Sequence, residues 1–331
     1  MPEKLLRVED LTVRAQTEKG AFDIVNGISF SMAPGEILGI VGESGCGKSM
    51  TALSIAGLLA RNVSPSAGRI LFGGRDLRAL PREEIRRIQG KELSMIFQEP
   101  MTSLNPLMKI GRQVSENLRL HSGLPKREIR GRTVAALRRV GLPEPERLLG
   151  AYPHELSGGM RQRVMIALAV ICRPKLIIAD EPTTALDVTI QAQILGLLRE
   201  INREYGCAIL FISHDLGVVS QLCSRILVMY AGSIVEEGAA RDIFRNPAHE
   251  YTKGLIGSIP TREMRGRRLA NIPGRVPAPS EKAVGCPFAP RCGKACGKCL
   301  LRRPEPTEVS PGHWAGCIRA QRESGAAYAF V

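Results

Sequence analysis

The segment Gly42–Ser49, Gly-Glu-Ser-Gly-Cys-Gly-Lys-Ser, constrains the fold more than any other part of the chain. It follows the apolar run Glu36–Val41, which predicts a buried strand, and leads into Lys48–Leu59, which has the composition of a helix. The pattern G-x-x-x-x-G-K-S/T between a strand and a helix is typical of a phosphate-binding loop. Its glycines let backbone amides point at phosphate oxygens, and the helix N-terminus favours anions. We therefore expect an α/β fold that binds a nucleoside triphosphate.

The side chains of this loop suggest how the nucleotide is held. Lys48 has the length and charge to reach the β- and γ-phosphates, and the Ser49 hydroxyl can ligate Mg²⁺. Cys46 is interpreted as a small spacer whose backbone, rather than its thiol, contributes to phosphate binding. The residues expected to contact the phosphates are Gly42, Ser44, Gly45, Cys46, Gly47, Lys48, Ser49 and Met50.

A second group of polar residues lies about 130 residues further along, where Leu176–Ala179 predicts a buried strand that runs into Asp180 and Glu181. Asp180, at the end of that strand, can hold the Mg²⁺ shell, and Glu181 can polarise the water that attacks the γ-phosphate. A strand ending in two acids is weak evidence by itself, but together with the phosphate loop it predicts nucleotide hydrolysis.

The length and composition of the whole chain predict a globular protein with one large domain and an appendage. It has 331 residues, 44% of them hydrophobic, and the longest apolar run, Val164–Cys172, is too short to cross a bilayer. The N-terminus has no secretory signal, which predicts a cytosolic location. Further strands are expected at Leu5–Val13, Ile24–Met32 and Cys207–Ser213, the strand before Asp180 is expected over Lys175–Ala179, and further helices are expected at 81–95, 126–142 and Gly158–Cys172. Alternating strands and helices indicate a largely parallel sheet.

Four more motifs complete a resemblance to the ATP-binding cassette family. Leu156–Gln162, Leu-Ser-Gly-Gly-Met-Arg-Gln, resembles the signature of that family, and Gln98 in Phe-Gln-Glu-Pro stands where the family has its Q-loop glutamine. Ala185-Leu-Asp187 is similar to the D-loop, and His214 in Ile-Ser-His-Asp is similar to the switch histidine. With the phosphate loop and the Asp-Glu strand, these motifs occur in the family's order between residue 5 and about residue 255.

The resemblance implies a fold and a set of roles. It implies a P-loop NTPase cassette over residues 1–255, comprising a RecA-like core, an antiparallel β subdomain and a helical subdomain at about 99–165. It also implies that two cassettes enclose ATP between them, each signature capping the nucleotide on its partner's phosphate loop. The residues it assigns to this capping are Ser157, Gly158 and Gly159, and Asp187 of the D-loop is also expected to bind the nucleotide. Gln98 would touch Mg²⁺ or the attacking water, and His214 would contact the γ-phosphate.

One position departs from the family pattern. The family stacks adenine on an aromatic side chain near the end of the first strand, and this sequence has Ala15 there. Two replacements are open: Arg14 could stack through its guanidinium plane, or Phe22 could fold in.

The spacing of the motifs indicates which branch of the family the chain resembles. Only about 58 residues separate Gln98 from Leu156, which leaves no room for the long insertion of DNA-repair relatives. Phe97–Pro106 resembles the importers of dipeptides, oligopeptides and nickel. This implies partners: a second ATPase subunit (a related chain or a copy), two membrane permeases and an extracytoplasmic solute-binding protein. The chain would then lie at the cytoplasmic face of the inner membrane.

An alternative function follows from the charge. The formal net charge is +14, and residues 256–331 carry thirteen Lys/Arg against five Asp/Glu. A basic tail of this kind also suits nucleic acid, which would make the chain a soluble cassette ATPase acting on nucleic acid. Only 4% of residues are aromatic, which argues against surfaces that stack bases.

Five of the nine cysteines crowd into residues 286–317. Cys286, Cys292, Cys299 and Cys317 have the spacing C-x₅-C-x₆-C-x₁₇-C, which resembles the C-terminal extension of the same importers and places an irregular appendage at 256–331. Four thiolates suit a [4Fe–4S] cluster, which the resemblance favours, or a structural zinc ion, and free thiols without such a role are the third alternative. Cys296 could compete as a ligand, because it forms C-x₂-C with Cys299. Nearby His313 is expected to be a surface residue rather than a ligand.

Overall fold

The computed structural model describes residues 4–18, 20–184, 186–260, 271–281 and 284–323. Ala185 of the D-loop and residues 261–270 of the basic segment lie outside the described residues. The chain divides into two compact units, and each is described by itself. Unit 1 contains 75–212 with two short N-terminal pieces, and unit 2 contains 6–31, 38–74 and the residues from 213 onward.

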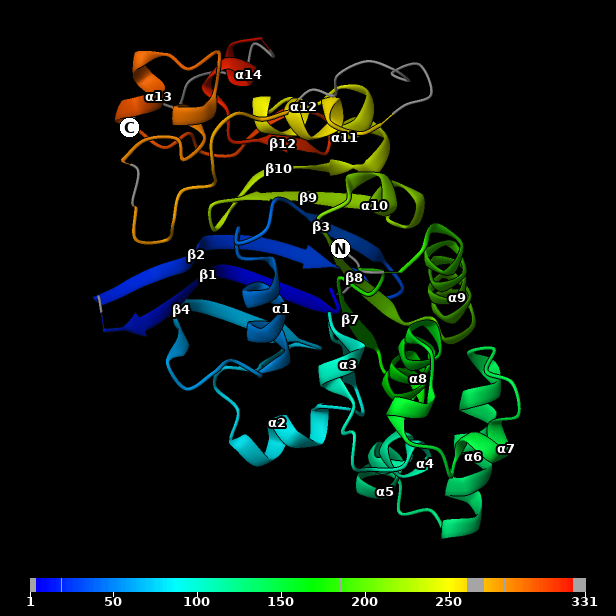
Figure 1. Cartoon of the computed structure of the whole chain (residues 1–331). Coiled ribbons are helices and arrows are strands. Elements are labelled where there is room, and N and C mark those ends of the chain that lie inside the picture. The colour runs from blue at the N-terminus through cyan, green and yellow to red at the C-terminus, as the bar shows by residue number, and fades with distance from the viewer. Residues whose placement is uncertain (1–3, 19, 185, 261–270, 282–283, 324–331) are drawn as a thin grey trace. The chain divides into compact units, whose positions relative to one another are not determined.

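Unit 1 combines a parallel sheet with a group of helices (Figure 1). Strands β6 (Leu93–Ile96), β7 (Leu176–Asp180) and β8 (Ala208–Ser213, whose last residue belongs to unit 2) run parallel in the order β6-β7-β8. β7 and β8 are buried along their whole length, which explains their uninterrupted apolar sequences. The short strand β5 spans Arg75–Asp76.

Three helices of unit 1, α3, α4 and α6, pack against α8 (Gly158–Val170), and α7 packs on α6 (Figure 1). The bounds of the helices besides α8 are α2 Arg82–Ile88, α3 Pro100–Ser103, α4 Ile110–Val114, α5 Glu116–His121, α6 Lys126–Arg139, α7 Pro145–Leu148 and α9 Val188–Tyr205, with a 3-10 turn at Pro153–Glu155. In α6 the apolar positions Ile129 and Leu137 are buried, as their helical spacing predicts. Burial of such a side chain contributes roughly 1.5–3 kcal/mol, so packing rather than propensity fixes these short helices.

The prediction of one helix over 81–95 is wrong for the second half of that range. Helix α2 ends at Ile88, because Gln89 adopts extended backbone angles and Gly90 turns the chain. Residues Leu93–Ile96 then form β6, which pairs with β7. Pairing with a distant strand outweighs the local helical pattern there.

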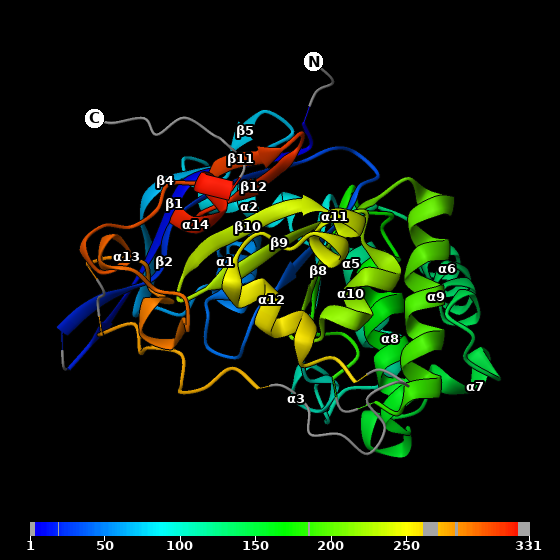
Figure 2. The ribbon, with the colours of Figure 1, turned by 90° about the horizontal axis from the view of Figure 1, so that it is seen from above.

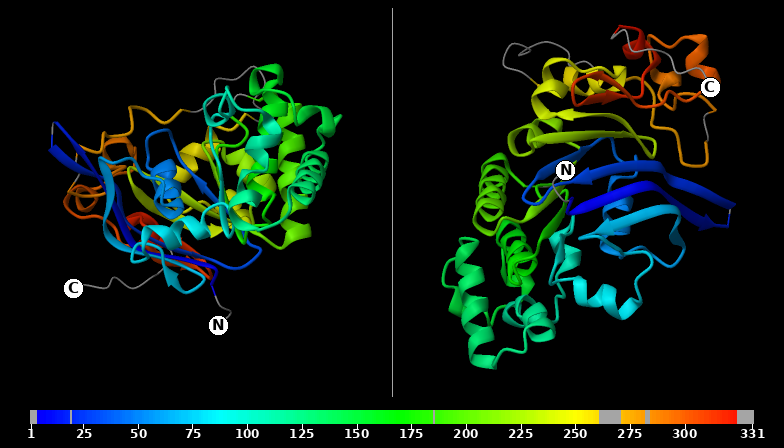
Figure 3. Two further views of the ribbon diagram at one scale, coloured as in Figure 1. Left: turned by 90° about the horizontal axis from the view of Figure 1, so that it is seen from below. Right: turned by 180° about the vertical axis from the view of Figure 1, so that it is seen from behind.

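Unit 2 contains two sheets. In the first, β1 (Leu6–Thr17) lies between β2 (Gly20–Met32, ending at the unit boundary) and β4 (Val63–Phe72), and it runs antiparallel to β4. Figure 3 shows these three long strands side by side, and α1 (Lys48–Ala56) packs against β1 and β4.

The second sheet of unit 2 has the order β3-β9-β10-β12-β11. β3 (Ile37–Val41) runs parallel to β9 (Arg225–Tyr230), and the remaining neighbours are antiparallel. Figure 2 shows α11 beside β10, the strand on which it packs. The other bounds are β10 Ser233–Ala239, β11 Thr307–Ser310, β12 His313–Ala315, α10 Leu216–Leu222, α11 Ala240–Arg245, α12 Glu250–Gly257, α13 Gly297–Leu301 and α14 Ile318–Glu323, with a 3-10 turn at Ala289–Arg291. The extension expected to be irregular thus contributes two strands.

No helix among the described residues is long and apolar enough to span a membrane.

Candidate functional site

The phosphate loop occupies the predicted place between β3 and α1. Its lysine is directed back at the loop itself: Nζ of Lys48 donates to the backbone oxygens of Gly42 (2.7 Å) and Glu43 (3.0 Å), and the side chain is only 4% exposed. Ser44 and Gly45 are exposed, whereas the side chain of Cys46 is buried. Burial raises the pKa of the Cys46 thiol, so it stays neutral at pH 7.

Gly42 is required by a close approach of two backbones. A Cβ atom at this position would lie 2.1 Å from the carbonyl oxygen of Met229 in β9 and 2.8 Å from Sγ of Cys46. The first residue of the loop therefore fits against the neighbouring strand only without a side chain.

Asp180 and Glu181 lie at the end of β7, and both are buried, with 4% and 8% of their surfaces exposed. Glu181 has a left-handed backbone (φ 46°), an uncommon conformation for a residue with a side chain. Its amide donates to the carbonyl oxygen of Ile212 at 2.9 Å. Backbone strain of this kind often occurs where a side chain must be aimed for function.

Two neighbours hold the carboxylate of Glu181. Its Oε2 accepts hydrogen bonds from Nε2 of Gln98 (3.1 Å) and from Oγ1 of Thr184 (2.9 Å). The structure thus brings together two sequence-predicted site residues 83 positions apart, within unit 1. Thr184 was not predicted. The signal that could have found it is a hydroxyl three residues after an acid, a spacing common in turns.

The signature and the D-loop both provide helix N-termini in unit 1. Ser157 caps α8 by accepting the amide of Met160 (3.3 Å), and Asp187 caps α9 by accepting the amide of Ile190 (2.9 Å). Gly158 and Gly159 form the first turn of α8, where amides without helical partners favour an anion.

His214 belongs to unit 2, together with the phosphate loop. It is exposed and stands between β8 and α10. The next residue, Asp215, caps α10 by accepting the amides of Gly217 (2.8 Å) and Val218 (3.2 Å). A capped helix directly after His214 fixes the backbone that carries this side chain.

The three residues considered for adenine differ in their surroundings. Ala15 is buried, with 4% of its surface exposed. Arg14 is held by Asp23, with Nε 2.6 Å from Oδ1 and Nη2 3.2 Å from Oδ2. Phe22 is half-buried. The Arg14 guanidinium is therefore the more fixed of the two candidate stacking groups.

Four of the five cysteines of the extension, Cys286, Cys292, Cys299 and Cys317, line one small cavity of about 20 Å³ in unit 2. Burial, with smaller contributions from the thiols of Cys299 and Cys317, raises the pKa of Cys286 to about 11. The Sγ atoms of Cys296 and Cys299 are 3.4 Å apart. Nevertheless, among the described residues no three His, Cys, Asp or Glu side chains are grouped closely enough to hold a metal ion.

The expectation that His313 is a surface residue is wrong. Its side chain is 2% exposed, and its Nε2 lies 2.7 Å from Oε1 of the buried Glu236. The carboxylate of Glu236 also accepts the backbone amides of Ala248 (2.7 Å) and His249 (2.9 Å). His313 therefore links β12 of the extension to β10 and to the residues before α12, which keeps it away from solvent.

The fold and these motifs define a P-loop ATP-binding cassette. Two structures support that class. The dimeric post-hydrolysis state of the ATP-binding cassette MJ0796 bound to ADP and Pi has a TM-score of 0.65 and 28% identity, covering 71% of this chain and 99% of that one. The structure of cbiO1 from Clostridium perfringens has a TM-score of 0.62 and 31% identity, covering 74% of this chain and 92% of that one.

Sequence comparison identifies the family. Residues 25–184 match the ABC transporter family, and residues 235–299 match the oligopeptide/dipeptide transporter C-terminal region. The chain is 49% identical to the oligopeptide transport ATP-binding protein OppD of Salmonella typhimurium and to a probable peptide ABC transporter ATP-binding protein of Sinorhizobium fredii. Each alignment covers 96% of this chain and 95% of the relative. The chain belongs to the ABC transporter family.

Proposed function

We propose that this chain hydrolyses MgATP and thereby powers the uptake of di- or oligopeptides, or of a similar small solute, through partner membrane subunits. The observation that carries the ATPase assignment is the buried carboxylate of Glu181, which directly follows Asp180 and is aimed by Gln98 and Thr184. Its relatives, named as peptide transport ATP-binding proteins, support the transport assignment.

We assign the chemical roles as follows. Lys48, whose Nζ lies against the backbone oxygens of Gly42 and Glu43, contacts the β- and γ-phosphates of ATP. Glu181 accepts a hydrogen bond from the attacking water and orients it, and His214 contacts the γ-phosphate. The residues assigned to Mg²⁺ are Ser49, Gln98 and Asp180, whose hydroxyl, amide and carboxylate oxygens are the donors that this ion prefers.

Each phosphate loop is half of a site in this scheme. Ser157, Gly158 and Gly159 present the N-terminus of α8 to the γ-phosphate held by a second cassette, and Asp187 helps to form the same interface. The second cassette is a related chain or a copy of this one. The similar structure of MJ0796 is itself described as dimeric.

We infer that the machine contains two permeases and receives solute from an extracytoplasmic binding protein. The chain would then be peripheral, at the cytoplasmic face of the inner membrane. Co-purification from native membranes, with identification of the partners and any bound solute, tests this assignment. A complex that contains nucleic acid and no membrane protein would instead favour the soluble alternative, and its binding would weaken steeply with added salt.

We further propose that Cys286, Cys292, Cys299 and Cys317 hold a [4Fe–4S] cluster, with zinc as the alternative. Two observations support this proposal: the four thiols line one cavity, and the donor set is chemically suitable. Among the described residues these thiols are not grouped closely enough to hold a metal ion, so binding would require them to move together. When bound, such a group would cross-link four points of the extension. The family match of 235–299 covers three of the four cysteines.

Replacement of Cys292 by serine is expected to abolish iron binding, because one of four thiolate ligands is lost. The measurement is the iron, sulfide and zinc content of anaerobically purified full-length protein, with its visible absorbance. Cys296→Ser is the matched control and should retain the metal. If Cys296→Ser loses the metal and Cys292→Ser keeps it, the ligand set is wrong; zinc without iron in the wild type rejects the cluster.

A further inference from the structure

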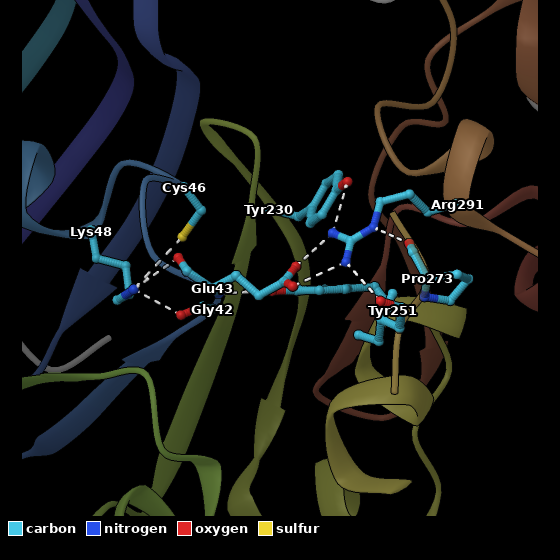
Figure 4. Close-up of polar contacts among 9 residues, drawn as sticks. Gly42, Glu43, Cys46, Lys48, Tyr230, Tyr251, Pro273 and Arg291 are labelled. Carbon is cyan, nitrogen blue, oxygen red and sulfur yellow. Dashed lines mark hydrogen bonds and ion pairs between the residues drawn. The ribbon is translucent and has the colours of Figure 1, made fainter. Parts of the chain in front are cut away.

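An arginine of the C-terminal extension is bound to the phosphate loop (Figure 4). Nη1 and Nη2 of Arg291 lie 2.7 and 3.0 Å from the two carboxylate oxygens of Glu43, the second residue of the loop. The Arg291 side chain is 5% exposed and that of Glu43 is 30% exposed. Both residues belong to unit 2, although 248 positions separate them. A two-pronged, largely buried pair of this kind fixes orientation as well as charge.

Arg291 is itself held in place by the extension. Its Nε donates to the carbonyl oxygen of Pro273 at 2.8 Å, and Nη2 donates to that of Ile272 at 3.3 Å. Its guanidinium also lies over the ring of Tyr230, 5.8 Å from the centroid. Because these contacts aim the guanidinium at Glu43, little ordering is needed to hold its carboxylate.

Glu43 is fixed at its two backbone polar groups as well. Its amide donates to the hydroxyl of the buried Tyr251 in α12 (2.8 Å), and its carbonyl oxygen accepts from Lys48 (3.0 Å). Tyr251 packs on Tyr230, with ring centroids 4.6 Å apart. The bonds from Tyr251 and Arg291 come from residues beyond the phosphate loop, so distant parts of the chain help to hold Glu43.

The charge of Glu43 has a consequence for nucleotide binding. A carboxylate beside a triphosphate repels it, and in a partly buried position that repulsion is weakly screened. Arg291 offsets this charge and holds the carboxylate against the extension. Removing one partner of a buried ion pair leaves the other uncompensated, which usually costs more than the pair contributes.

We propose that Arg291 is a positioning residue of the ATP site, so that the C-terminal extension completes the phosphate loop by neutralising and holding Glu43. This inference rests on the proposed function of Gly42–Ser49 as the ATP-binding loop. It gives the extension a role in nucleotide affinity through contacts that need no metal. Arg291 precedes Cys292 in the chain, so the cysteine segment and the loop are joined by one side chain.

The test measures equilibrium binding of N-methylanthraniloyl-ATP with Mg²⁺ to full-length variants, together with their melting temperatures. Arg291→Met is expected to raise the dissociation constant about tenfold, a moderate effect because the carboxylate of Glu43 keeps some contact with solvent. Arg291→Lys should raise it less, because lysine restores the charge and not the two-pronged geometry. The control Arg275→Met removes an exposed arginine of the same extension, paired to Glu281, and should bind like the wild type.

The double variant separates charge from structure. Once Glu43→Gln has removed the carboxylate, adding Arg291→Met should not weaken binding further, so Glu43→Gln and Glu43→Gln/Arg291→Met should bind alike. An unchanged dissociation constant in Arg291→Met overturns the inference, as does a further loss of affinity when Arg291→Met is added to Glu43→Gln. If Arg291→Met does not fold, Arg291→Lys decides: affinity equal to the wild type overturns the inference.

The variant Lys48→Met distinguishes a failure of the inference about Arg291 from a failure of the proposed ATP site. It should lose nucleotide binding, because it removes the phosphate-binding charge. If Lys48→Met binds like the wild type, the ATP site itself is misassigned. If Lys48→Met loses binding while the Arg291 variants do not, only the role of Arg291 is wrong.

Discussion

Replacement of Glu181 by glutamine is expected to lower ATP turnover at least about a hundredfold, the usual loss when a general base is removed. The amide oxygen of glutamine can still accept the hydrogen bonds of Gln98 and Thr184, so the local structure should persist. ATP binding should persist as well, and the variant should accumulate as an ATP-bound assembly of two cassettes. Steady-state turnover, nucleotide retention and size-exclusion chromatography with MgATP measure these effects.

Glu200→Gln is the matched control for this experiment. Glu200 lies on α9 in the same unit, with 64% of its side chain exposed and an ion pair to Arg139. Surface pairs of this kind contribute roughly 0–1 kcal/mol, so turnover should stay near the wild-type value. Turnover within threefold of the wild type in Glu181→Gln would reject the assignment of Glu181, whereas loss of ATP binding would make its role structural.

Local sequence determines the elements around the site. The strand, the glycine-rich loop and the helix at 36–56 are continuous in the chain, so their order could be predicted without knowing any distant contact. The same holds for β7 and its two acids, because an unbroken apolar run is typical of a strand buried on both faces.

Contacts between distant residues account for what the sequence did not reveal. His313 looks like a turn residue beside Gly312, yet its ring pairs with Glu236, which lies 77 positions earlier. Arg291 looks like one of many basic residues of the tail, and only the structure places it on Glu43. Such pairs leave no periodic pattern in a single sequence. Helix α2 ends early for a similar reason, because the following residues pair with β7.

Replacement of Gly42 by alanine is expected to lower kcat/KM for ATP about a hundredfold, because the phosphate loop must move. The added Cβ would lie 2.1 Å from the carbonyl oxygen of Met229, which is backbone and cannot swing aside as a side chain can. A displacement near 1 Å in a phosphate-binding loop is enough for a loss of about a hundredfold. The melting temperature should fall as well, because β9 is buried beside β3.

Gly73→Ala provides the control for backbone strain without a clash. Gly73 has φ +52° and no atom within 4 Å of its added Cβ, so this substitution costs only the roughly 1–2 kcal/mol of a left-handed backbone. It should lower the melting temperature and leave the KM for ATP unchanged. If Gly42→Ala behaves in the same way, the contact between the loop and β9 does not set the geometry of the nucleotide site. A selective loss of ATP affinity in Gly42→Ala would instead mean that β9 holds the phosphate loop in its binding conformation.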